Sequence, residues 1–181
     1  MVSILKTDKI QASHGTNIEI PSGHKISGAA GSIVAPEKVI GFKTVSSSTS
    51  TQISSATFVD LSGMTLDYAC KVSNSIVHIF VNTHVFIPQH AATWQTASIK
   101  ILRDSTALYT DTGYGTGHHT NHSNDRFMSV ISVQASTSPG NTNTQTYKVQ
   151  GSRMSGQSGN VDFNNSSYGG GGSITVMEIA Q

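Results

Sequence analysis

The densest group of side chains capable of chemistry is the segment Gly117-His118-His119-Thr120-Asn121-His122, which holds three of the chain's eight histidines. Neutral imidazole is a common transition-metal ligand, so a metal site is one interpretation of this segment. His118 and His122 would face the same way only in a helix, which the neighbouring Gly and Asn residues disfavour. We therefore interpret the segment as a polar, receptor-facing loop, with a metal site as the alternative.

Two tyrosines and an asparagine extend the same region of the chain. Tyrosine rings can stack on sugars and loop amides can bond to sugar hydroxyls, so a glycan is one ligand that these residues would suit. A tyrosine in a β-loop more often packs within its own domain, so packing is the competing interpretation of the two rings. The predicted receptor-facing set is Tyr109, Tyr114, His118, His119, His122 and Asn124.

Motifs specific to enzymes are missing from the sequence. The cluster Gly113-Tyr114-Gly115-Thr116-Gly117 lacks the lysine and the following helix of a phosphate-binding loop. No nucleophile elbow, zincin helix or cysteine pair occurs, and the ten carboxylates are scattered along the chain. We expect no catalytic residue, no resident metal and no cofactor.

Composition narrows the class of partner. Charged residues make up only 12% of the chain and the net charge is +1, so neither a nucleic-acid backbone nor an anionic membrane is indicated. Ser and Thr supply about a quarter of the residues, which suits exposed β-surfaces. The single Cys70 lies in an apolar pattern and is expected to be a buried small hydrophobe rather than a reactive thiol. With no signal peptide or membrane span in the pattern, we expect the protein to be made and kept in the cytoplasm in which it is synthesised.

Period-two alternation of apolar residues recurs along the chain, whereas helical spacing is never sustained, so the predicted fold class is all-β. Regular short strands with Gly, Ser and Asn turns indicate a jelly-roll sandwich. The expected strands after residue 56 are Thr57–Leu61, Met64–Lys71, Ser75–Ile87, Ala97–Arg103, Ala107–Thr110, Phe127–Ala135, Thr144–Gly151, Gly159–Asn164 and Ser173–Ala180.

Two regions are expected, an extended N-terminal segment at 1–38 and a β-domain at 39–181. The first has too few apolar residues for its own core, so it should gain stability by pairing with other chains. Its predicted attachment residues are Ile4, Leu5, Ile10, Ile18 and Ile20. The Ser/Thr run Ser46–Ser55 is interpreted as a long edge strand rather than a disordered linker, because it lies between apolar segments and lacks Pro and charge.

The strand expected at 75–87 has two unlike faces. One carries aliphatic residues typical of a core, while the other mixes aromatic residues with His and Asn, as subunit interfaces do. Cover by the chain's own loops is the alternative. The predicted interface residues are Ile76, His78, Phe80, His84 and Phe86.

Glu178 interrupts the last apolar strand. A carboxylate buried at such a position needs a partner, and Arg103, Lys148 or Arg153 is expected to supply it within the sandwich.

Several segments together resemble the C-terminal domains of tail-fibre and fibre-like structural proteins of marine bacteriophages. The resemblance lies in Thr57-Phe58-Val59-Asp60, Ile101-Leu102-Arg103-Asp104, Thr146-Tyr147-Lys148-Val149-Gln150 and Gly172–Ala180, with Asn17–Ile26 similar to the lead-in that precedes such domains. It implies a jelly roll like those of tumour necrosis factor and C1q, which forms a homotrimer, with its N-terminus on the virion and its head outward.

The leading hypothesis is therefore a homotrimeric bacteriophage fibre, attached to a tail adaptor or capsid protein, that binds the host surface. A capsid decoration protein that stabilises the shell is the alternative. A cellular adhesion module of the C1q type is disfavoured by the lack of an export signal and of a disulfide.

Overall fold

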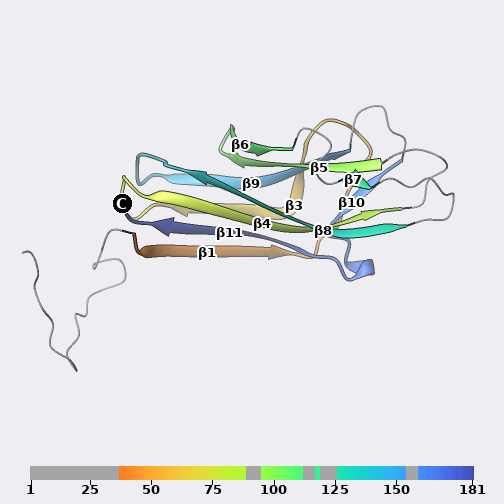
Figure 1. The fold of residues 1–181 in the computed structure, drawn as a ribbon, viewed down its shortest axis with the longest axis horizontal. Coiled ribbons are helices and arrows are strands. Elements are labelled where there is room, and N and C mark those ends of the chain that lie inside the picture. Colours follow the sequence, from red (N-terminus) through yellow and green to blue (C-terminus); the bar gives the residue numbers. More distant parts are fainter. Residues whose placement is uncertain (1–36, 89–94, 112–116, 119–125, 154–158) are drawn as a thin grey trace, which may run out of the picture. The chain divides into compact units, whose positions relative to one another are not determined.

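The computed structural model describes residues 37–88, 95–111, 117–118, 126–153 and 159–181 (Figure 1). These residues belong to one compact unit. Nearly all of the predicted N-terminal segment, including Ile4, Leu5, Ile10, Ile18 and Ile20, lies outside the described residues.

The described part of the chain is all-β, as predicted, and contains a single turn of 3-10 helix. The elements are β1 (Val39–Ser47), β2 (Thr51–Ile53), β3 (Val59–Ala69), β4 (Ile76–Ile87), β5 (Gln95–Arg103), β6 (Thr106–Thr110), β7 (Gly117–His118), β8 (Phe127–Thr137), β9 (Thr144–Arg153), β10 (Val161–Phe163), η1 (Ser166–Tyr168) and β11 (Gly172–Ile179).

Two antiparallel sheets form a jelly-roll sandwich. In the first sheet β4 pairs with β8 along one edge, and with β11 and then β10 along the other, while β1 adds to β11 and β2 to β10. In the second sheet the order is β3-β9-β5-β6, with β7 also paired to β5. Figure 1 shows β5, β6 and β9 in one layer and β1, β4 and β11 in the other. Strands far apart in sequence thus become neighbours, as two Greek keys require.

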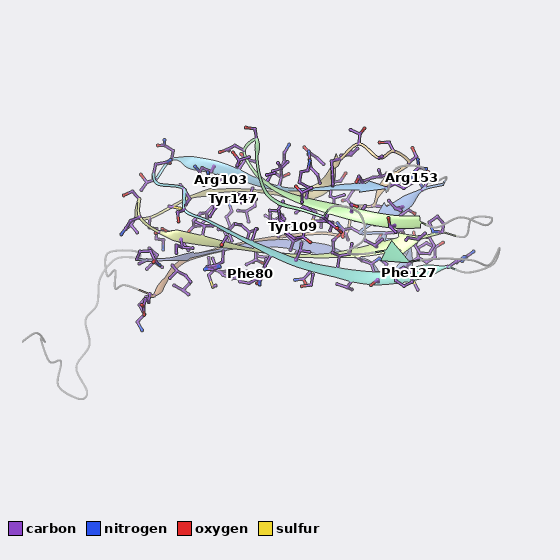
Figure 2. The ribbon with its side chains drawn as sticks, turned by 45° about the horizontal axis from the view of Figure 1, so that its top comes forward. Phe80, Arg103, Tyr109, Phe127, Tyr147 and Arg153 are labelled. Atoms are coloured by element: carbon purple, nitrogen blue, oxygen red, sulfur yellow. The ribbon has the colours of Figure 1, made fainter. Side chains whose placement is uncertain are left out.

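The core lies between the two sheets and is filled by alternate residues of their strands. From β4 it takes Val77, Ile79, Val81, Val85 and Ile87, each at most 1% exposed. The second sheet contributes Tyr147, which is fully buried, and Figure 2 shows Phe80 of β4 on the opposite side of its sheet from this ring. Cys70 is buried beside this core as a free thiol, and burial raises its pKa to about 11, so the expected small hydrophobe is confirmed.

The predicted strand positions are confirmed, with one merger. The strands expected at 57–61 and 64–71 form the single β3, whose register with β9 shifts between Asp60 and Thr65. Gly63 lies at this irregularity with φ of +71°, a conformation that glycine adopts without strain.

The prediction of one long strand through the Ser/Thr run is wrong. The run divides into the end of β1 and the short β2. β1 pairs with β11, whereas β2 pairs with β10. Between them Ser47 Oγ accepts a hydrogen bond from the Thr49 amide and donates one to the Ser62 carbonyl. Local bonding of hydroxyls to the backbone competes with strand pairing, which explains the break.

Glu178 is fully buried in β11 and is held by neutral groups alone among the described residues. Its carboxylate accepts hydrogen bonds from Tyr68 Oη at 2.7 Å, from Ser75 Oγ at 2.6 Å and from the Lys71 and Val72 amides at 2.9–3.2 Å. All of these donors lie in or beside the turn that joins β3 to β4. The Glu178 side chain therefore fixes the turn between β3 and β4 to β11, the last strand of the chain, which belongs to the first sheet.

The prediction that Glu178 has a cationic partner is therefore wrong. Lys148 forms an ion pair with Asp60 at 2.8 Å, Arg103 Nη1 bonds to Thr137 Oγ1, and Arg153 Nη1 bonds to the Gly159 carbonyl. Sequence reasoning assumed that a buried carboxylate needs a cation, but several well-placed neutral donors also stabilise the charged form.

The environment of Glu178 combines opposing effects on its pKa. Burial raises the pKa, but the hydrogen bonds from Ser75, Tyr68 and the two amides outweigh it, and the pKa is lowered below its ordinary value of 4.5. Gly41 of β1 is part of this arrangement, because a Cβ there would collide with Tyr68 Oη.

We expect Glu178→Gln to lower the free energy of unfolding at pH 7 by about 3 kcal/mol, since an amide cannot accept all of the donated hydrogen bonds. Because the pKa of Glu178 is lower in the folded than in the unfolded protein, its ionised carboxylate stabilises the fold at any pH above the unfolded-state pKa. This stabilisation is lost as the pH falls through the folded-state pKa. The difference from wild type should therefore shrink below about pH 4.5. Urea denaturation at one fixed protein concentration from pH 7 to pH 3 measures both effects.

Glu37→Gln, the same change on an exposed side chain, is the control and should leave stability within about 0.5 kcal/mol of wild type. If Glu178→Gln does not fold, Tyr68→Phe removes one donor only and should cost about 1 kcal/mol. A Glu178→Gln protein as stable as Glu37→Gln at pH 7 would contradict this account.

Candidate functional site: an uncharged sheet face

The side of the first sheet that points away from the core carries no Asp, Glu, Lys or Arg side chain on β1, β11, β4 or β8. Strand register defines this set, because every second residue of β4 and its paired neighbours face the same way. We call it the uncharged face. It comprises Val39, Phe42, Thr44 and Ser46 of β1; Ser173, Thr175, Met177 and Ile179 of β11; Ile76, His78, Phe80, Asn82, His84 and Phe86 of β4; and Met128, Val130, Ser132, Gln134 and Ser136 of β8.

Large apolar side chains on this face are open to solvent in the single chain. Phe42 is 66% exposed, Val130 63%, and Met128 and Val39 55% each. Of the large hydrophobic residues that are exposed in the described ranges, only Val59 belongs to the second sheet. Apolar surface gathered on one side in this way marks an interaction site more often than scattered residues do.

The chain itself covers the end of the face where β4 finishes. The Tyr168 ring of η1 stacks on Phe86 with centroids 4.0 Å apart, and Phe86 is only 3% exposed. Gly170 lies against His84, because a Cβ built on Gly170 would be 2.5 Å from His84 Nδ1. The alternative of cover by the chain's own loops thus holds for His84 and Phe86.

The other end of the face has no such cover among the described residues. Here Ile76, His78 and Phe80 of β4 lie beside Met177 of β11 and are partly exposed. The His78 and Phe80 rings stack at 6.4 Å. The predicted interface residues therefore divide, with Ile76, His78 and Phe80 available to a partner and His84 and Phe86 already covered.

The outer side of the second sheet differs in its chemistry. Asp60 of β3 forms a hydrogen-bonded ion pair with Lys148 and accepts a second hydrogen bond from Gln150. Lys100 of β5 lies 4.1 Å from the centroid of the Phe58 ring. These charges suit a solvated surface, so the two outer sides of one sandwich differ in kind.

Hydroxyl and amide groups occupy the middle of the uncharged face. Ser46, Ser173, Asn82 and Ser132 form one row across four strands, and the neighbouring row includes a Thr44–Thr175 hydroxyl bond of 2.9 Å. A shallow groove of about 470 Å³ beside this row is lined by Ser46, Ser47, Ser48, Asn82, Gly171, Gly172 and Ser173. Sequence reasoning missed the contributions of β1, β8 and β11 to the face, since only pairing brings them beside β4.

The predicted receptor-facing set lies mostly outside the described residues. Tyr114, His119, His122 and Asn124 are not described, and of His118 only the backbone is, paired in β7 with Gln95. Tyr109 lies in β6 rather than in a loop and packs against the core, which favours the packing alternative for this ring.

Within the ranges that the structure covers, no group of three or more His, Cys, Asp or Glu side chains is arranged to hold a metal ion. The same ranges contain no helix of the length and apolar character that a membrane span requires.

The sequence matches no known protein family and no curated protein. Among solved structures, the chain is similar to the VP2 protein of infectious bursal disease virus in derived T=1 particles of a D431N mutant, with 12% identity and a TM-score of 0.43. It is also similar to the T13 particle of that virus, with 8% identity and a TM-score of 0.45. Each match covers 87% of this chain and 40% of the viral protein chain.

We expect Tyr168→Ala to lower the free energy of unfolding by about 1 kcal/mol, because it removes the ring stacked on Phe86 and exposes apolar surface. Tyr168→Phe keeps the stack and should stay close to wild type. Urea denaturation of the three proteins at equal concentration measures the difference. Equal stability of the Ala and Phe variants would mean that Tyr168 does not cover this end of the face.

Proposed function

We propose that this chain is a structural protein of a bacterial virus, a homotrimeric, fibre-like projection that attaches to the particle through its N-terminal segment and binds the host surface. The activity is binding and involves no catalytic step. The bacteriophage fibre domains that the sequence resembles suggest both the virion and the number of copies.

The uncharged face is the observation that carries this proposal. Serine, threonine, asparagine, glutamine and neutral histidine each offer both a donor and an acceptor, so a face built from them can pair with a copy of itself. Its exposed Phe42, Met128 and Val130 would be removed from water by the same contact. With no charge of either sign on the face, identical copies do not repel one another. A second copy of this chain is therefore the partner that suits the surface.

The two ends of the sandwich suit an attached and a free end. β1 begins beside the end of β11, where Val39 pairs with Ile179, so the described chain enters and leaves the domain at one end. β7, β10 and η1 lie at the other end, beside the finish of β4 (Figure 1). The residues before 39 would then join the particle at the first end, and loops at the second end would meet the host.

Trimerisation gives such a head its binding strength. Three equal loop contacts on one rigid body act at high effective concentration once the first has formed, so each one can be weak while the particle still adsorbs.

We expect the full chain to sediment as a trimer at neutral pH, and Phe42→Lys or Val130→Lys to shift it toward monomer by at least tenfold in the association constant. A buried, unpaired ammonium in the interface is the reason. Val59→Lys, the same kind of change at a 43% exposed site of the second sheet, is the matched control and should remain trimeric. Sedimentation velocity over a concentration series makes the comparison. A monomeric wild-type chain, or a trimer unaffected by Phe42→Lys and Val130→Lys, would contradict the proposal.

Cryo-electron microscopy of the virus that encodes this chain tests its place on the particle. We expect trimeric heads at the tail, with the end that carries β7, β10 and η1 pointing outward. Trimers set on the shell would make the chain a capsid decoration protein, and absence of the chain from the particle would overturn the assignment to the virion.

A further inference from the structure

His78 lies in the uncovered part of the uncharged face. Across the sheet it faces Met177 of β11 and Ser136 of β8, and along β4 it is flanked by Ile76 and Phe80. Its ring is partly buried and stacks on Phe80. Its surroundings are thus apolar or hydroxylic on every side that the described chain supplies.

No carboxylate on the described part of this face can compensate a positive charge at His78. Phe42 of β1, Ile179 of β11 and Gln134 of β8 are further neighbours on the face, and none of them titrates. Glu178 points to the other side of the sheet, where its oxygens accept hydrogen bonds from Tyr68, Ser75 and two amides.

Four other ionisable groups lie further off. Glu37 and Lys38 precede β1 and are exposed, joined to Ala180 through their backbone. His84 is the second histidine of the face and is covered by Gly170, while Asp162 of β10 is buried beside Phe86 at the far end.

Protonation changes what an imidazole can do in a contact between copies. The neutral ring donates one hydrogen bond and accepts another, so it can pair with a hydroxyl, an amide or a second histidine. The imidazolium only donates, carries a charge that must lose water on association, and repels its equivalents in the other copies. Histidine undergoes this change between neutral pH and the pH of acidified compartments or surfaces.

We propose that the interface between copies is acid-labile and that His78 is the group that senses the proton. The inference rests on the proposed function, since it requires the uncharged face to be covered by a second copy. A projection of this kind would be assembled at neutral pH and would loosen its trimer where the surroundings turn acidic.

His84 supplies the matched comparison. It is the same residue type on the same strand and face, but Gly170 of its own chain already covers its Nδ1 edge. Association therefore changes its surroundings little, and its substitution should not alter how assembly responds to pH.

The experiment measures the association constant of the full chain by sedimentation velocity at pH 7.5 and pH 5.5, at one ionic strength. At pH 5.5 the contribution of Glu178 is still present, because its carboxyl titrates below 4.5. If each of three protonated rings opposes assembly about tenfold, the association constant of wild type should fall about a thousandfold at pH 5.5. His78→Gln should stay trimeric at both values, and His84→Gln should dissociate in acid as wild type does.

His78→Phe, which keeps a ring against Phe80, is the second variant in case the glutamine protein does not assemble. Circular dichroism at pH 5.5 verifies that each protein is folded. A wild-type trimer equally stable at both pH values, or a His78→Phe trimer that dissociates in acid like wild type, would overturn the inference while leaving the proposed function standing. A wild-type monomer already at pH 7.5 would instead remove the proposed function, and this inference with it.

Discussion

The fold depends on the two-sided pairing of β4. This strand hydrogen-bonds to β8 along one edge and to β11 and β10 along the other, so its own backbone is satisfied and its side chains alone decide what each face contacts. One face of alternate aliphatic residues closes the core against the second sheet. The other face is then forced outward with whatever residues it carries, because the period of a strand is two.

The buried carboxylate of Glu178 explains how the two sheets are held in register at the end where β1 begins. Its acceptor oxygens bind the Tyr68 hydroxyl on β3 and the turn that leads into β4, while its backbone pairs with β4 and β1. Apolar packing is not directional, so it does not by itself fix where one sheet lies along the other. A satisfied buried polar group does, since displacement would leave a charge without donors.

The two outer sides of the sandwich differ in charge, and the proposed function depends on this difference. The second sheet presents the Asp60–Lys148 pair and Lys100 to solvent, whereas the face around Phe42 and Phe80 carries no charge. Both sheets bury the same core, so stability does not require the difference. The proposed contact between copies of the chain would account for the difference, since rows of hydroxyl and amide groups can pair with rows of the same kind.

The sequence by itself determined the fold class and nearly all strand positions, because alternation and turn residues are local signals that read directly along the chain. It also determined that β4 has an unusual second face, since that face lies within one strand. The tertiary structure alone decided what surrounds it. Met177, Phe42 and Val130 join His78 and Phe80 only through pairing of strands distant in sequence, and Tyr168 covers Phe86 only because η1 folds back over it. The partners of Glu178 were beyond sequence reasoning for the same reason, because the donors are neutral groups that chain topology, and not residue type, places around the carboxylate.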